Sequence, residues 1–149
     1  MKIVLDTNII ARAVTSPSGL AAEILSRSIE DGNLLCTSTF MLAELDRVLR
    51  YPRLQKIHGL TDSKIEDFVR SIQQVALVVD VEPAKSPSVT RDTDDDPVVE
   101  TAVRTKSDFL CSVDKDLLTQ PVVDHCLTFG IRAVTDIKLI AILRNVAPH

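Results

Sequence analysis

The chain has 149 residues, 45% of them hydrophobic and 26% charged, a length and apolar content that suit one domain over residues 1–149 with a single buried core. Only 3% of the residues are aromatic and Trp is absent, which argues against a protein that binds single strands mainly by stacking bases on exposed rings. The formal net charge of −4 argues against a basic protein that coats nucleic acid non-specifically, but it does not exclude a local basic patch that holds phosphates.

Short apolar runs alternate with amphipathic stretches in the first half of the chain. Lys2–Leu5 has the character of a buried strand, and the polar turn Asp6-Thr7-Asn8 closes it. Ser16-Pro17 offers a helix cap and a first-turn proline, which predicts a helix that ends near Gly32. A second strand is expected over 34–37, then helices over 38–50 and from residue 61, with a break at Tyr51-Pro52.

The second half continues the alternation. Residues 82–95 contain two prolines and several Ser and Thr residues, which indicates an exposed loop before a helix that opens at Asp96-Pro97. The other expected elements are strands over 76–81, 109–113 and 131–134, a partly helical stretch over 117–129 ended by Gly130, and a last helix over 137–143. Strands that alternate with helices predict an α/β fold, in which a parallel sheet of about five strands is covered by helices on both faces.

Two acidic residues stand where predicted strands stop, Asp6 after the first strand and Asp114 after the fourth. In open α/β sheets, ligands gather beyond the carboxyl ends of the strands, so we expect these two carboxylates to be neighbours. Taken alone, each residue fits a structural role, as an Asx-turn or a helix N-cap, as well as it fits the role of a ligand.

Glu44 lies on a predicted helix among apolar neighbours, at the spacing that places its carboxylate on or beside the core-facing side. A buried, unpaired charge costs several kcal/mol, so Glu44 must pair with a cation, take up a proton or bind a metal ion. A structural salt bridge to Arg47 or Arg12 is the alternative to a functional role.

The acidic run from Asp92 to Asp96 precedes Pro97, as is ordinary for a helix N-cap. Additional acids beside that cap gain little for capping, whereas carboxylates at a helix N-terminus can orient around a divalent ion. The sequence does not fix which of Asp94, Asp95 and Asp96 points inward. Oxygen ligands without organised Cys or His favour Mg²⁺ or Mn²⁺ over zinc, and such ions typically serve phosphate chemistry.

Four stretches of this chain together resemble the PIN-domain ribonucleases, particularly the VapC-like toxin components of toxin–antitoxin pairs. They are Val4–Asn8, Phe40–Leu45 followed by Val48-Leu49, Asp94–Val99, and Ser112–Leu118. The resemblance implies a three-layer α/β/α sandwich. It also implies that Asp6, Glu44, Asp96 and Asp114 are the catalytic residues and bind one or two Mg²⁺ or Mn²⁺ ions.

The same resemblance implies supporting roles and partners. Asn8 and Ser112 match polar positions that support the site, and Asp95 and Asp116 are auxiliary candidates. The usual Gly before the fourth acid is Val113 here, a change that affects loop shape more than ligands. The implied activity is metal-dependent hydrolysis of RNA phosphodiester bonds. The implied partners are an RNA substrate, a small antitoxin protein that covers the acidic cleft, and a second copy of the chain in a homodimer.

Three other functions compete with this interpretation. A receiver-like signalling module needs a lone acceptor Asp that closes a central strand. Asp80 could take this place, but the following Val81-Glu82-Pro83 and the lack of a suitably placed Lys argue against it. Phosphatases with an Asp nucleophile after the first strand usually carry a second Asp two residues later, where this chain has Asn8. A non-catalytic PIN-like binding domain is the third alternative, and the four intact acids argue against it.

The remaining features set limits on cofactors and surroundings. Cys36, Cys111 and Cys126 lack CxxC spacing and are expected to be buried, reduced thiols, and no histidine shows zinc spacing with them. The first residues resemble neither a signal peptide nor a membrane span, so a cytoplasmic protein is expected. Basic residues near the proposed edge can contact an RNA backbone or simply be solvated: Arg12, Arg47, Arg50, Arg53 and Lys115.

Overall fold

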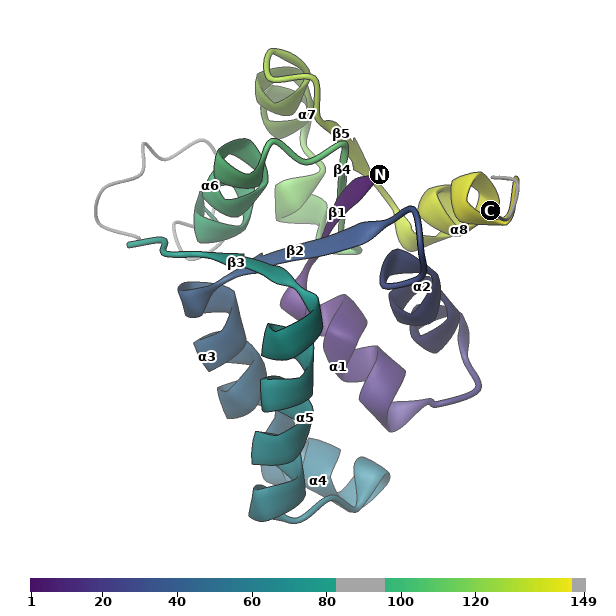
Figure 1. Cartoon of the computed structure of the whole chain (residues 1–149), viewed down its shortest axis with the longest axis vertical. Helices are drawn as coiled ribbons and strands as arrows, with labels where there is room; N and C mark the ends of the chain where they lie inside the picture. Colours follow the sequence, from purple (N-terminus) through teal and green to yellow (C-terminus); the bar gives the residue numbers. More distant parts are fainter. Residues whose placement is uncertain (83–95, 146–149) are drawn as a thin grey trace.

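Five parallel strands form the centre of the molecule (Figure 1). The computed structural model describes residues 1–82 and 96–145, except for the side chain of Asp96. The strands are β1 (Lys2–Leu5), β2 (Leu34–Ser38), β3 (Leu77–Val79), β4 (Phe109–Cys111) and β5 (Arg132–Val134). Their order in the sheet is β3-β2-β1-β4-β5, so β1 is central and β3 and β5 are the edges.

Helices cover both faces of this sheet (Figure 1). One face carries α1 (Thr7–Thr15), α2 (Leu20–Ser28), α3 (Thr39–Leu49), α5 (Asp62–Val75) and α8 (Asp136–Asn145). The other face carries α6 (Asp96–Thr105), the 3₁₀ turn η3 (Lys115–Leu117) and α7 (Gln120–Leu127). The short helix α4 (Pro52–His58) contacts α1 and α3 at the outer end of the first layer. The expected three-layer α/β/α sandwich with a parallel sheet is therefore confirmed.

The side chains of β1 explain why two helical layers form. Ile3 and Leu5 pack into the core cluster of the first layer, and Val4 packs into the cluster of the second. All three side chains are fully buried. Because successive side chains of a strand point to opposite faces, a continuous apolar strand requires cover on both sides. This arrangement keeps β1 in the middle of the sheet and places its carboxyl end at the centre of one edge.

The structure corrects the expected elements in two places. The polar turn expected at Asp6-Thr7-Asn8 is the start of α1, and Asp6 occupies its N-cap position. The break expected at Tyr51-Pro52 is present, since α3 ends at Leu49, but an unpredicted helix, α4, follows it with Pro52 as its first residue. Gly59 follows α4 with φ +68°, a left-handed conformation that glycine adopts without strain. The strands are present as expected, although β3 and β4 are shorter than predicted.

Further predictions from the sequence can be compared with the described residues. The three cysteines are free and buried, as predicted. Burial is the main reason why the pKa of the Cys111 thiol is raised to about 12. The loop expected over 82–95 lies, apart from Glu82, outside the described residues. None of the helices within 1–82 and 96–145 is long and apolar enough to cross a membrane.

Candidate active site

Asp6 and Ser112 form the centre of the candidate site at the carboxyl edge of the sheet. Asp6 directly follows β1, Ser112 directly follows β4, and the register pairs Leu5 with Cys111, so the next residues meet. The hydroxyl of Ser112 donates to Asp6 Oδ2 over 2.8 Å. Asp6 is only 5% exposed and Ser112 is fully buried. The carboxylate is therefore held inside the protein in one orientation.

Asp114 is tied to the same hydroxyl. Its backbone N–H donates to Ser112 Oγ over 2.9 Å. Its own Oδ1 accepts the backbone N–H of Asp116 over 2.9 Å, which caps η3. The capping role considered for Asp114 is therefore present, and the expected neighbourhood of Asp6 and Asp114 is confirmed.

The surroundings of Asp6 disfavour its charged form. Burial is the main cause that raises the pKa of the Asp6 carboxyl, and the nearby charge of Asp114 raises it further. The hydrogen bonds from Ser112 and from the backbone of Thr7 act in the opposite direction. A buried carboxylate beside a second one is stabilised when a positive charge lies between them.

The ligand atoms available at this edge are of the chemical type that binds hard cations. They are carboxylate and hydroxyl oxygens, which Mg²⁺ and Mn²⁺ prefer. Thr7 Oγ1 is buried beside Asp6 and has no hydrogen-bond partner among the described residues. Within the same part of the chain, no three His, Cys, Asp or Glu residues gather into a metal-binding group. Because Glu44 is among these residues, a full ligand set in this arrangement needs oxygen atoms from the acidic run that ends at Asp96.

Glu44 reaches this edge from α3. The helix begins after Ser38, whose hydroxyl accepts the backbone N–H of Met41 over 3.3 Å. Glu44 is half-buried and lines a cavity of about 420 Å³ together with Asn8 and Val113. Because Val113 immediately precedes Asp114, this cavity opens beside the Asp6–Ser112–Asp114 cluster. Glu44 thus shares a cavity with the residue before Asp114, and its role in the site stays a prediction.

The position of Asp96 is described only through its backbone. It is the first residue of α6, which agrees with the predicted helix start, while the side chains of Asp92 to Asp96 lie outside the described part. The hydroxyl of Thr101 donates to Ser38 Oγ over 2.9 Å and holds the middle of α6 at the carboxyl end of β2. The role of Asp96, and the choice among Asp94, Asp95 and Asp96, stays a prediction.

The basic residues near the edge separate into two groups. Arg12, Arg47 and Arg53 line the 420 Å³ cavity. Arg50 instead forms ion pairs with three acids of α3 and α5, Asp46 at 3.1 Å, Asp62 at 3.4 Å and Glu66 at 3.3 Å. Arg50 is therefore a structural cation, and Lys115 is an exposed residue of η3.

Asp136 is an acidic residue at the same edge that the sequence reasoning missed. It follows β5 and begins α8. Its Oδ2 lies 3.6 Å from the guanidinium of Arg12, and its charge contributes to the raised pKa of Cys111. Arg12, one of the two cations considered as partners of Glu44, therefore pairs with Asp136. The rule that identified Asp6 and Asp114, an acid directly beyond a strand, also applies to Asp136.

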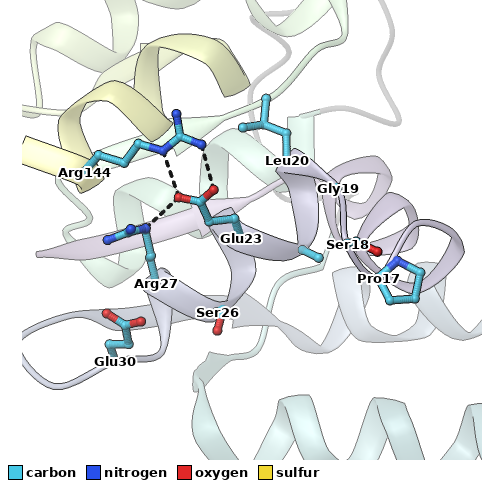
Figure 2. Close-up of a pocket in the computed structure, with 10 residues that line it drawn as sticks. Pro17, Ser18, Gly19, Leu20, Glu23, Ser26, Arg27, Glu30 and Arg144 are labelled. Carbon is cyan, nitrogen blue, oxygen red and sulfur yellow. Dashed lines mark hydrogen bonds and ion pairs between the residues drawn. The ribbon is translucent and has the colours of Figure 1, made fainter.

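A second cavity, of about 530 Å³, lies between α2 and the end of α8 (Figure 2). Glu23 stands at its centre and binds Arg144 through two hydrogen bonds of 2.7 and 2.9 Å and Arg27 through one of 2.8 Å. The hydrogen bonds from Arg144, and next those from Arg27, lower the pKa of Glu23 to about 2. This cavity shares no lining residue with the 420 Å³ cavity, and the carboxylate of Glu23 is engaged by both arginines.

The receiver-like alternative does not agree with the sheet. Its acceptor, Asp80, would have to close a central strand, but Asp80 follows β3, which is an edge strand. Asp80 is exposed, and its backbone carbonyl accepts a hydrogen bond from Arg104. The acids that do share a central edge are Asp6 and Asp114.

Comparisons with known proteins agree with this fold. A family model described as PIN domain matches residues 2–116. The uncharacterized protein MJ1680 of Methanocaldococcus jannaschii is 28% identical over 119 residues, which cover 80% of this chain and 74% of that protein. The solved structure of SSO1118, a PilT N-terminus domain protein from Sulfolobus solfataricus P2, superposes with a TM-score of 0.54 at 13% identity. That superposition covers 100% of this chain and 98% of the other, and at this identity it shows the fold alone.

Proposed function

The chain belongs to the PIN-domain family, whose members are generally nucleases, and from this premise we propose that it is a metal-dependent endoribonuclease. One observation carries the proposal: a buried Asp6 is hydrogen-bonded to Ser112 and stands beside Asp114 at the carboxyl edge of the sheet. Such an arrangement keeps two carboxylates close together although their charges repel. It is suited to holding a cation against a phosphate.

The proposed roles follow from where each residue stands. Asp6, Asp96 and Asp114 would bind Mg²⁺ or Mn²⁺ directly or through water, and Glu44 would bind the ion or orient the attacking water. A bound divalent cation lowers the pKa of the attacking water and offsets negative charge on the phosphate during in-line displacement. Ser112 fixes the orientation of Asp6 and the backbone at Asp114, and no side chain has to act as a covalent nucleophile.

We extend the proposal to a biological role, the toxin of a type II toxin–antitoxin pair. The support is the resemblance of the four acidic stretches to such toxins. A small antitoxin protein would then cover the acidic edge and insert a basic side chain between the carboxylates. The homodimer expected for such a toxin belongs to the same proposal, and a molecular mass measured in solution tests it.

The first test is cleavage of a mixed-sequence, single-stranded RNA in Mg²⁺, in Mn²⁺ and in EDTA. We expect cutting by the wild type only with metal. Asp6→Asn and Asp114→Asn should each lower the cleavage rate by at least about 100-fold, since even residues that only support a metal ligand cost 10- to 100-fold. Asp124→Asn is the matched control, because Asp124 is an exposed residue of α7.

Two outcomes decide against this function. If the wild type cuts RNA equally well in EDTA, metal dependence is wrong. If cutting survives both Asp6→Asn and Asp114→Asn at the rate of Asp124→Asn, the carboxylates are structural and the activity lies elsewhere.

A further inference from the structure

The cavity beside Glu44 has the size and position of a substrate subsite. Its volume of about 420 Å³ lies within the usual range of small-ligand pockets, roughly 300–1,000 Å³. Its walls come from α1, α3 and α4, and α1 contacts both of the other helices. Glu44 and Val113 join it to the acidic edge. A chain whose phosphate reacts at that edge would therefore continue into this cavity.

The charge of the cavity is opposite to that of the whole protein. Three arginines and one glutamate line it, while the formal net charge of the chain is −4. Arg12 is engaged by Asp136 at 3.6 Å. Arg47 and Arg53 are exposed, and neither forms an ion pair with any residue of 1–82 or 97–145. Guanidinium groups in this state are suited to bidentate binding of phosphate oxygens.

The position of Arg47 connects the cavity with Glu44 at the acidic edge. It lies three residues after Glu44 on α3, so the two side chains are neighbours on one side of the helix. Arg53 faces the same cavity from α4. The two cations therefore reach the cavity from different helices and can bind a ligand in it at two points.

Tyr51 adds an aromatic surface between these cations. It is the single tyrosine of the chain, it lies between α3 and α4, and it is 42% exposed although it lines the cavity. Val48 and Leu54 provide apolar walls next to it. A ring of this kind, exposed beside arginines, can stack on a base of a single strand without regard to sequence.

We propose that this cavity binds one nucleotide of a single-stranded RNA next to the phosphate that is cut. Arg47 and Arg53 bind phosphates of the strand, and Tyr51 stacks on the base. This inference rests on the proposed ribonuclease function, because it assigns the neighbouring acidic edge to the chemistry. A single strand fits better than a duplex, since only an unpaired base can leave its stack and enter a cavity of this size.

Binding of a short, fluorescein-labelled, mixed-sequence RNA tests the proposal by fluorescence anisotropy in EDTA, where no cutting is expected. Arg47→Ala and Arg53→Ala should each weaken binding severalfold and reduce the slope of log K against log salt by about 0.7, the value for one phosphate contact on a single strand. Tyr51→Leu should weaken binding by about fivefold or more, and Tyr51→Phe should bind like the wild type.

Two control variants separate a specific subsite from a general effect of charge. Lys56→Ala removes an exposed cation from the same helix as Arg53 but outside the cavity, and Arg70→Ala removes one from α5. Both should bind RNA like the wild type. All these side chains are exposed or line the surface cavity, so circular dichroism and thermal unfolding of the variants should match the wild type.

Steady-state cleavage in Mg²⁺ or Mn²⁺ provides a second readout. Loss of Arg47, Arg53 or the ring of Tyr51 should raise KM and leave kcat within about twofold, because these residues bind parts of the substrate that do not react. Loss of Asp6 should lower kcat. The two parts of the site therefore respond differently.

Each outcome has a definite meaning. The proposed subsite is wrong if Arg47→Ala and Arg53→Ala keep the affinity and salt slope of the wild type. It is also wrong if Lys56→Ala weakens RNA binding as much as they do. Neither result affects the nuclease proposal. A duplex or a nucleoside monophosphate that binds as tightly as the single strand also overturns the subsite. If the arginine variants lose RNA binding but the wild type does not cut RNA with either metal, the subsite stands and the proposed function fails.

Discussion

Ser112 is the residue through which the two described carboxylates are positioned. Its hydroxyl donates to Asp6 and accepts the backbone N–H of Asp114, and the side chain is fully buried. An alanine there would remove a donor to a buried carboxylate and the acceptor of a backbone N–H at the same time. Hydrogen bonds to charged groups contribute more than neutral ones, about 1.5–3 kcal/mol.

We therefore expect Ser112→Ala to lower the free energy of unfolding by about 1–3 kcal/mol and the cleavage rate by about tenfold or more. Unfolding in urea and RNA cleavage in Mg²⁺ measure the two effects. Ser28→Ala is the matched control, because the buried hydroxyl of Ser28 donates only to the carbonyl of Ile24 within α2. If both variants lose the same stability and keep full activity, Ser112 does not orient the site.

At the scale of elements, the sequence predicts the sheet well because β1, β2 and β4 each contain three consecutive apolar residues in a short run. It fails for two helices for different reasons. The apolar residues of α1, Ile9, Ile10 and Ala13, do have helical spacing, but the polar run Asp6-Thr7-Asn8 predicts a turn that closes the strand. α4 has seven residues and no buried side chain, so it leaves no apolar periodicity to detect. Its signals are a proline at its start and Gly59 after its end.

The candidate site is predictable where it depends on strand ends and unpredictable where it depends on register. Asp6 and Asp114 follow from the rule that ligands gather beyond parallel strands. Their link through Ser112 depends on the pairing of Leu5 with Cys111, which no local pattern encodes. In the same way, only the packing of α3 on α5 reveals that Arg50 is engaged while Arg47 faces the cavity.

The pairing of Glu23 with Arg144 joins two elements that are far apart in sequence, α2 and α8. The pKa of Glu23 is lowered from 4.5 to about 2 in the folded protein, first by Arg144 and then by Arg27. Between these two values the unfolded chain binds more protons than the folded one. The contribution of Glu23 is therefore complete above pH 4.5 and is lost as the pH falls toward 2.

We expect Glu23→Gln to lower the Tm at neutral pH by a modest amount, because the ion pairs are partly exposed. The difference in Tm between wild type and variant should shrink as the pH falls below 4.5 and vanish near pH 2. Thermal unfolding across this range measures it. Glu30→Gln, at an exposed residue of the same cavity, is the matched control. A Tm difference that stays constant with pH would contradict the role of the Glu23 charge.

At the scale of the whole molecule, the acidic edge that the proposed function requires lowers the stability of the protein without metal. Asp6 is buried where its charge is disfavoured by desolvation and by Asp114, and both effects act on the protein without metal. A neutral amide of the same shape avoids both effects and can still accept the hydrogen bond from Ser112. Functional residues commonly lower the stability of a protein in this way, by about 0.5–2 kcal/mol.

The last prediction follows from this conflict and concerns which protein, the wild type or Asp6→Asn, has the higher Tm with and without metal. In EDTA, Asp6→Asn should unfold at a higher temperature than the wild type, because the buried charge is gone. Mg²⁺ or Mn²⁺ should then raise the Tm of the wild type, since a ligand that binds only the folded state contributes about 2.7 kcal/mol at one hundred times its Kd. The variant should respond much less, so that the order of the two curves reverses at saturating metal. Asp124→Asn should follow the wild type in both conditions. If the wild type is more stable than Asp6→Asn in EDTA and neither shifts with metal, Asp6 is a structural acid and the edge of the sheet binds no cation.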